Sequence, residues 1–119
     1  MTGSDELMIS AILNHEEFSY NFREVHPEGD TVSVSLHGAL CASLDFRKGF
    51  VTIYGESLNS RKSAKVFNAI LRTFTECHAK SDHGKWEIVV PVGLEVEFSG
   101  QTLKVPFCKR NSGLFLTNV

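Results

Sequence analysis

Cysteine and histidine are the side chains of this sequence best suited to nucleophilic or metal chemistry. Segment 76–84, ECHAKSDHG, groups four candidate ligands: Cys77, His78, Asp82 and His83. Zinc sites need three or four ligands at characteristic spacings, and neither CxxC nor HxxxH occurs in the chain. We therefore expect no metal and no cofactor, with Cys77 in the core and both histidines capping the end of a helix.

A catalytic nucleophile is equally hard to locate. The motif GxSxG and the phosphate-binding patterns GxxxxGK[ST] and GxGxxG are all missing from the sequence. Cys108 is the best thiol candidate, because the positive charges of Lys109 and Arg110 beside it favour a thiolate. Most free cysteines are inert, so we predict no catalytic residue. A small enzyme or ligand-binding domain with a cleft between helix and sheet is an alternative, with Cys108, His37 and His83 as its first candidates.

The stretch NSRKSAKVFNAILRTFTECH, residues 59–78, is the most strongly patterned in the chain. Its apolar residues recur at helical spacing and predict a helix over 60–78 with a buried side. That side consists of Val66, Phe67, Ile70, Leu71 and Phe74.

The opposite side of this expected helix is basic. The set comprises Arg61, Lys62, Lys65, Asn68 and Arg72 of the helix, with Arg47 and Lys48 in the preceding turn. At 100° per residue, all the helix members except Lys62 fall within an arc of about 60°. Such a stripe is either solvated or contacts nucleic acid or an acidic partner. The net charge of −2 and the lack of aromatic residues among these cations count against nucleic acid.

Aromatic residues alternate with polar ones near the acidic beginning of the chain. Phe18, Tyr20 and Phe22 share one face of an expected strand over 16–25. They are either core residues or, if the long helix covers the other face of the sheet, an exposed interaction patch that would suit a homodimer. The paired carboxylates Glu95 and Glu97 are expected on a solvated strand face.

The order of periodic segments predicts an α+β fold. A short N-terminal helix over 5–14, begun by Ser4, precedes a meander of about four antiparallel strands. The long helix and two to three further strands complete it, and the helix should pack on one face of the sheet. The expected strands are 16–25, 31–37, 39–46, 50–55, 85–91, 93–101 and 102–107.

At the scale of the chain, 119 residues fit one compact domain, 1–119. The three scattered cysteines and the lack of an N-terminal signal sequence favour the cytoplasm. The first 30 residues hold seven acidic side chains against one basic one, Arg23. We expect a non-enzymatic protein that acts by binding a macromolecule, in the first place another protein, as a regulator or inhibitor. Nucleic-acid binding through the basic side of helix 60–78 is the alternative.

Overall fold

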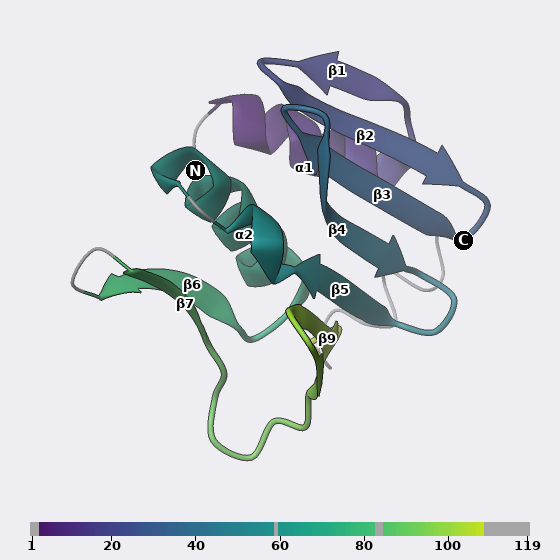
Figure 1. The fold of residues 1–119 in the computed structure, drawn as a ribbon. Helices are drawn as coiled ribbons and strands as arrows, with labels where there is room; N and C mark the ends of the chain where they lie inside the picture. Colours follow the sequence, from purple (N-terminus) through teal and green to yellow (C-terminus); the bar gives the residue numbers. More distant parts are fainter. Residues whose placement is uncertain (1–2, 59, 83–84, 109–119) are drawn as a thin grey trace.

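A computed structural model describes residues 3–58, 60–82 and 85–108 (Figure 1). Its elements follow the order α1 (Gly3–Asn14), β1 (Phe18–Tyr20), β2 (Arg23–Glu28), β3 (Thr31–Leu36), β4 (Ala39–Asp45), β5 (Phe50–Tyr54), the 3-10 turn η1 (Gly55–Ser57), α2 (Arg61–Phe74), β6 (His78–Asp82), β7 (Lys85–Val89), β8 (Glu97–Ser99) and β9 (Thr102–Pro106). Among these residues, no helix combines the length and the apolar character needed to cross a bilayer.

Seven strands form one antiparallel sheet in the order β1-β2-β3-β4-β5-β9-β8. The first five are neighbours in sequence, as a meander requires. Strand β9 joins the far side of β5, where Ile53 pairs with Leu103. Strands β6 and β7 form a separate hairpin beside α2. The predicted α+β architecture, with a meander followed by a helix and further strands, is confirmed.

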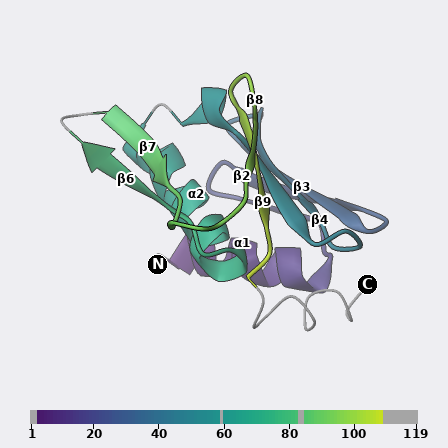
Figure 2. The same ribbon diagram turned by 90° about the horizontal axis from the view of Figure 1, so that it is seen from below.

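Both helices cover the same face of the large sheet (Figure 2). Residues that point to this face, such as Val32, Val34 and Val51, are completely buried. They pack against the apolar side of α2, where Val66, Phe67, Ile70, Leu71 and Phe74 are also buried, as predicted. The other face carries a polar row across the strands: His26, Ser33, Ser43, Thr52 and Lys104. This alternation is typical of a sheet with one solvated side.

The expected strand over 16–25 is in fact a hairpin of two strands. Asn21 and Phe22 both have positive φ angles, 52° and 65°, and connect β1 to β2 as a two-residue turn. A turn of this kind needs left-handed backbone at both positions, which asparagine tolerates well. The alternation of aromatic and polar residues on either side of the turn concealed it in the sequence.

The ends of both helices differ from the expectation. Helix α1 begins at Gly3, so Ser4 lies inside it instead of capping it. Helix α2 begins at Arg61 after the capping residue Ser60, whose hydroxyl accepts a hydrogen bond from the backbone N–H of Ser63. It ends at Phe74, and His78 is the first residue of β6, so the helix is shorter than the predicted 60–78. His83 lies outside the described residues.

Two strand predictions were incomplete. Strand β6 was missed, because its residues HAKSD lack an apolar alternation. The predicted strand over 93–101 contributes only Glu97–Ser99 to the sheet. A β-bulge between β3 and β4 also changes one face assignment. The extra residue turns Cys41 inward beside Ala42 and leaves Leu40 exposed, whereas strict alternation with Ala42 and Leu44 would place Leu40 inside.

Candidate functional site

Two tight turns project from the same end of the sheet, beside the beginning of α2. One holds Asn21 and Phe22, and the other holds His37 and Gly38, with φ angles of 53° and 79°. They lie together because β1–β2 and β3–β4 are alternate hairpins of one meander. Left-handed backbone costs a residue other than glycine about 1–2 kcal/mol. Phe22 carries this cost while its side chain is 61% exposed, so burial in the core does not explain it.

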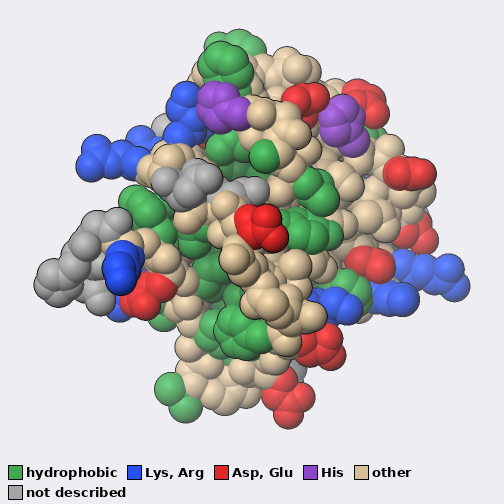
Figure 3. Space-filling model, viewed as in Figure 1, with side chains coloured by type: hydrophobic (Ala, Val, Ile, Leu, Met, Phe, Trp, Pro, Cys, Tyr) green, Lys and Arg blue, Asp and Glu red, His purple; other side chains and the backbone are tan. Residues whose placement is uncertain are grey.

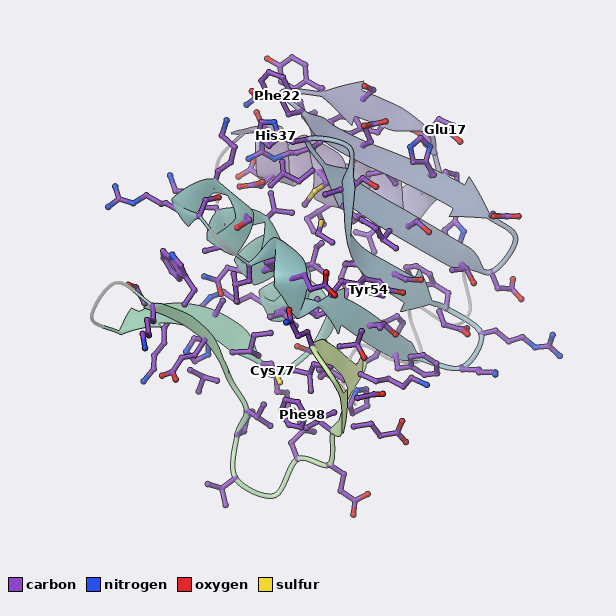
Figure 4. The ribbon with its side chains drawn as sticks, viewed as in Figure 1. Glu17, Phe22, His37, Tyr54, Cys77 and Phe98 are labelled. Atoms are coloured by element: carbon purple, nitrogen blue, oxygen red, sulfur yellow. The ribbon has the colours of Figure 1, made fainter. Side chains whose placement is uncertain are left out.

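The Phe22 ring contacts both a histidine ring and a lysine ammonium group. The rings of Phe22 and His37 stack with their centroids 4.5 Å apart and their planes inclined by 23°. Lys62 Nζ lies 5.3 Å from the centroid of the Phe22 ring, within the range of a cation–π interaction. Figure 4 shows Phe22 and His37 together at this end of the sheet. An aromatic pair and a cation from three separate elements therefore meet at the surface.

A buried ion pair holds the Phe22 turn in place. Arg23 Nε donates to Asp5 Oδ1 of α1 over 2.7 Å, and both side chains are almost fully buried. The Nη1 group of Arg23 also donates to the backbone carbonyl of Asn21 over 3.0 Å. The side-chain amide of Asn21 donates to Ser4 Oγ, and the backbone N–H of His37 donates to the backbone carbonyl of Phe22. The exposed ring is thus carried by a rigid turn, and such preorganisation lowers the entropic cost of binding.

Two further apolar side chains are exposed next to this turn. Leu7 of α1 is 54% exposed and Tyr20 of β1 is 57% exposed. Both border a shallow cavity of about 560 Å³ that is also lined by Gly3, Ser4 and Glu6. We call the set Leu7, Tyr20, Phe22, His37 and Lys62 the turn-end surface. It combines large apolar side chains with an adjacent cation, as the centre and rim of protein interfaces do.

The predicted row of three aromatics divides into two environments. Phe18 is half-buried against the core, with its ring centroid 6.5 Å from that of Tyr20. Tyr20 and Phe22 are exposed, Tyr20 at the end of β1 and Phe22 in the turn that follows it. The two exposed members belong to the turn-end surface, and Phe18 does not.

The cations predicted on α2 are exposed, and no acidic side chain among the described residues pairs with them. They are Arg61, Lys62, Lys65 and Arg72. Three of the seven N-terminal acids engage other partners: Asp5 binds Arg23, and Glu17 and Glu24 flank His26. Asn68, in contrast, does not belong to a free stripe, because its amide binds the backbone of Ala79 with both polar atoms.

Arg47 and Lys48 do not extend this basic surface. Their backbone N–H groups donate to Asp45 Oδ1 in the β4–β5 turn. That turn lies at the end of the strands opposite to the Phe22 and His37 turns, because consecutive turns of a meander alternate between the two ends. The basic side chains over the beginning of α2 and over the β4–β5 turn accordingly appear as separate groups (Figure 3). The structure therefore divides the predicted cationic set into two.

The structure does not bring Cys108 and His37 together. Cys108 is buried, and its N–H donates to the carbonyl of Phe74 at the end of α2, whereas His37 is exposed near the beginning of α2. Cys41 is also buried, and desolvation raises the pKa of its thiol to about 12. Within residues 3–58, 60–82 and 85–108, no three His, Cys, Asp or Glu side chains form a group that would hold a metal ion.

Sequence reasoning identified Tyr20, Phe22, Arg61 and Lys62 but missed Leu7 and the stacking of His37 on Phe22. Asn21 and Gly38 are of types that readily adopt a positive φ angle, so the pairs Asn21–Phe22 and His37–Gly38 could have indicated two turns in the sequence. Comparison with known proteins found no family model that matches the chain, and no curated protein or solved structure with significant similarity to it. A function for this chain therefore has to be argued from its own surface.

Proposed function

We propose that this protein binds another protein through the turn-end surface and acts as a regulator or inhibitor of that partner. One observation carries the proposal: three large apolar side chains, Leu7, Tyr20 and Phe22, are each more than half exposed in one rigid region. Monomeric proteins rarely group such side chains on their surface without an interaction to serve. Aromatic anchors held in a fixed conformation are typical of binding hot spots.

The charge next to these anchors favours an acidic partner. Arg61, Lys62 and Lys65 follow one another along the first two turns of α2 and have no acidic partner among the described residues. An acidic segment with an apolar or aromatic side chain would place its apolar group on Phe22 and its carboxylates near these cations. The proposal also places the protein in the cytoplasm, where its buried cysteines would remain reduced.

Replacement of Phe22 by asparagine separates binding from folding. Asparagine tolerates left-handed backbone better than phenylalanine, so we expect Phe22→Asn to leave the free energy of unfolding unchanged or higher. We expect the same change to abolish partner capture, because the anchor is lost. Urea unfolding measures the first effect, and affinity capture from the source cells by the immobilised chain, with nuclease present, measures the second.

Val92→Asn is the control, because Val92 is a fully exposed apolar residue in the loop between β7 and β8, which lies far from the turn-end surface (Figure 1). Its variant should retain the partners that Phe22→Asn loses. If both variants capture the same proteins, the turn-end surface is not the binding site. Sedimentation equilibrium of the purified chain distinguishes a second copy from a different partner, and loss of a dimer on Phe22→Asn would identify the homodimer.

Nucleic acid is the second candidate, and one observation favours it. The stacked rings of Phe22 and His37 beside Lys62 resemble in chemistry the aromatic and cationic pairs on which single-stranded bases stack. Fluorescence polarisation with labelled single-stranded DNA and RNA at several salt concentrations tests this. Binding should weaken steeply with salt, and the triple change of Arg61, Lys65 and Arg72 to alanine should reduce the salt slope. Unchanged binding and slope in that variant would exclude this candidate.

A further inference from the structure

We propose a second, separate binding site: the free edge of β7, which would accept an extended peptide segment as an additional strand. The site is a groove of about 280 Å³ between the β6–β7 hairpin and the β8–β9 hairpin. Its walls include Trp86 and Ile88 on one side and Phe98 and Gln101 on the other. Figure 2 shows β7 as the strand of its hairpin that lies nearer to β8. This proposal does not rest on the turn-end surface.

The register of the β6–β7 hairpin shows which backbone groups face the groove. Ala79 pairs with Ile88, and both backbone polar groups of Ala79 bind the Asn68 side chain instead of β7. Pairs alternate along an antiparallel ladder, so Ala79 and Ile88, like Ser81 and Trp86, form non-hydrogen-bonded pairs. The N–H and C=O groups of Trp86 and Ile88 therefore point away from β6.

At the other edge of the same hairpin, the polar backbone groups of Ala79 point outward. The Asn68 side chain binds both: the Ala79 N–H donates to Oδ1 over 2.6 Å, and Nδ2 donates to the Ala79 carbonyl over 2.8 Å. The β6 edge of the hairpin is thus occupied by the Asn68 side chain. Among the described residues, no further strand lies beside the β7 edge.

The residues that line the groove favour an added peptide strand as its occupant and not a small-molecule ligand. Trp86, Glu87 and Ile88 are consecutive and all border it, although side chains of a strand alternate between its faces. The groove therefore runs along the backbone edge of β7 and not over one of its faces. Its volume is below the 300–1,000 Å³ common for drug-sized ligands and suits one or two apolar side chains of a peptide.

Phe98 forms the facing wall and is 72% exposed. By the same alternation of pairs, its own N–H and C=O point away from β9, since Ser99 and Thr102 flank a two-residue loop and so form a hydrogen-bonded pair. The groove has a wall on each side, β7 and Phe98, and its volume of about 280 Å³ suits the few side chains of one extended segment. The occupant that we propose is therefore a peptide segment and not another folded hairpin.

The charge of Glu87 defines the sequence that the groove would favour. Glu87 is exposed, lies between Trp86 and Ile88 on β7, and forms an exposed ion pair with Lys80 of β6, whose Nζ lies 3.5 Å from Glu87 Oε1. Directly opposed side chains of opposite charge stabilise an antiparallel pair, and like charges destabilise it. The segment should therefore alternate apolar residues, which face Trp86, Ile88 and Phe98, with a cationic residue opposite Glu87.

Synthetic peptides provide the test. The probe is a seven-residue peptide TVKVKVT with blocked ends, and the acidic control is TVEVEVT. Trp86 is the single tryptophan of the chain, so its fluorescence reports occupancy directly. We expect TVKVKVT to change this fluorescence with saturation at about 0.1–1 mM and the acidic peptide to bind at least about fivefold more weakly. Hydrogen exchange should slow at the amides of Trp86 and Ile88 but not at Glu87.

Two controls separate strand addition from simple apolar contact. A TVKVKVT peptide that is N-methylated at its three valines keeps the side chains but loses the donors that would pair with β7, and it should not bind. On the protein, Phe98→Ala should weaken binding about fivefold, whereas Leu40→Ala, at an exposed apolar side chain that does not line the groove, should have no effect. Equal binding of the N-methylated peptide, self-association of the chain through Trp86, or unchanged fluorescence with TVKVKVT would each overturn the proposal.

Discussion

At the residue scale, Gly55 is a position where the neighbouring backbone leaves no room for a side chain. Its N–H donates to the Gln101 carbonyl over 2.8 Å, and a Cβ added there would lie 2.6 Å from that oxygen. The β5 end and the β8–β9 turn would have to separate, so we expect Gly55→Ala to reduce the free energy of unfolding by about 1–3 kcal/mol. Gly3→Ala is the control, because no atom lies within 4 Å of its added Cβ. Equal urea midpoints for the two variants would contradict the close approach.

His26 gives the chain a pH-dependent contact on the solvated side of the sheet. Its Nδ1 lies 3.0 Å from Glu17 Oε2 and its Nε2 lies 3.3 Å from Glu24 Oε2. The hydrogen bond to Glu17, opposed by desolvation, is the largest cause that raises the pKa of His26 above its ordinary value of 6.5. A raised pKa in the folded state stabilises the fold fully below pH 6.5, and this contribution disappears as the pH rises through the raised value.

The corresponding measurement is an NMR titration of the His26 ring. Glu17→Gln should move the pKa of His26 back towards 6.5, and it should flatten the dependence of the urea midpoint on pH above 6.5. Glu28→Gln removes an exposed carboxylate of the same hairpin and serves as the control. A His26 pKa that is equal in both variants would show that Glu17 is not the main cause.

The sequence predicts which types of residue the candidate site contains, but it does not predict which of them contact one another. The helical period predicts exposed lysines and arginines on one side of α2. For Tyr20 and Phe22, the sequence leaves open whether they are core residues or part of an exposed patch. That Phe22 would stack on His37 depends on two turns meeting across 15 residues. No local period encodes that meeting, which arises from the pairing of β2 with β3.

At the scale of elements, Asn68 connects α2 to the β6–β7 hairpin. Its amide makes both hydrogen bonds to Ala79. We expect Asn68→Ala to leave these backbone groups unsatisfied and to destabilise the hairpin by about 1–3 kcal/mol. Hydrogen exchange at the amides of β6 and β7 should become faster, with little change in β2 and β3. Asn14→Ala is the control, since Asn14 bonds only to exposed Ser10. Equal exchange rates in β6 for both variants would refute this connection.

Elements with a strong period were predicted well, and those governed by backbone detail were not. Strands β3 and β5 alternate cleanly, and α2 carries an unbroken apolar side, so burial alone defines them. The bulge at Val34 and Ser35, which leaves Leu40 outside, has no compositional signature. Strand β6 lacks an apolar pattern, and a hairpin partner and the Asn68 side chain hold it in place.

At the scale of the whole molecule, the three cysteines provide a readout of global unfolding. Cys41, Cys77 and Cys108 are all buried, and burial raises the pKa of Cys41 and Cys77. We expect none of the three thiols to react with an aromatic disulfide reagent at pH 8 in the folded state, and all to react in urea. Rapid labelling of Cys108 alone in the folded state would show that the end of the sheet at β9 opens separately.

The position of β9 has a consequence for the order in which the chain folds. Strands β1 to β5 pair with sequence neighbours, so each contact closes a short loop. The pairing of Ile53 with Leu103 instead closes a loop of about 50 residues, whose entropic cost has to be met before the contact stabilises anything. We therefore expect the meander and α2 to form the folding nucleus and β9 to dock afterwards. During synthesis, the backbone groups along the free edge of β5 would then remain unpaired until β9 has left the ribosome.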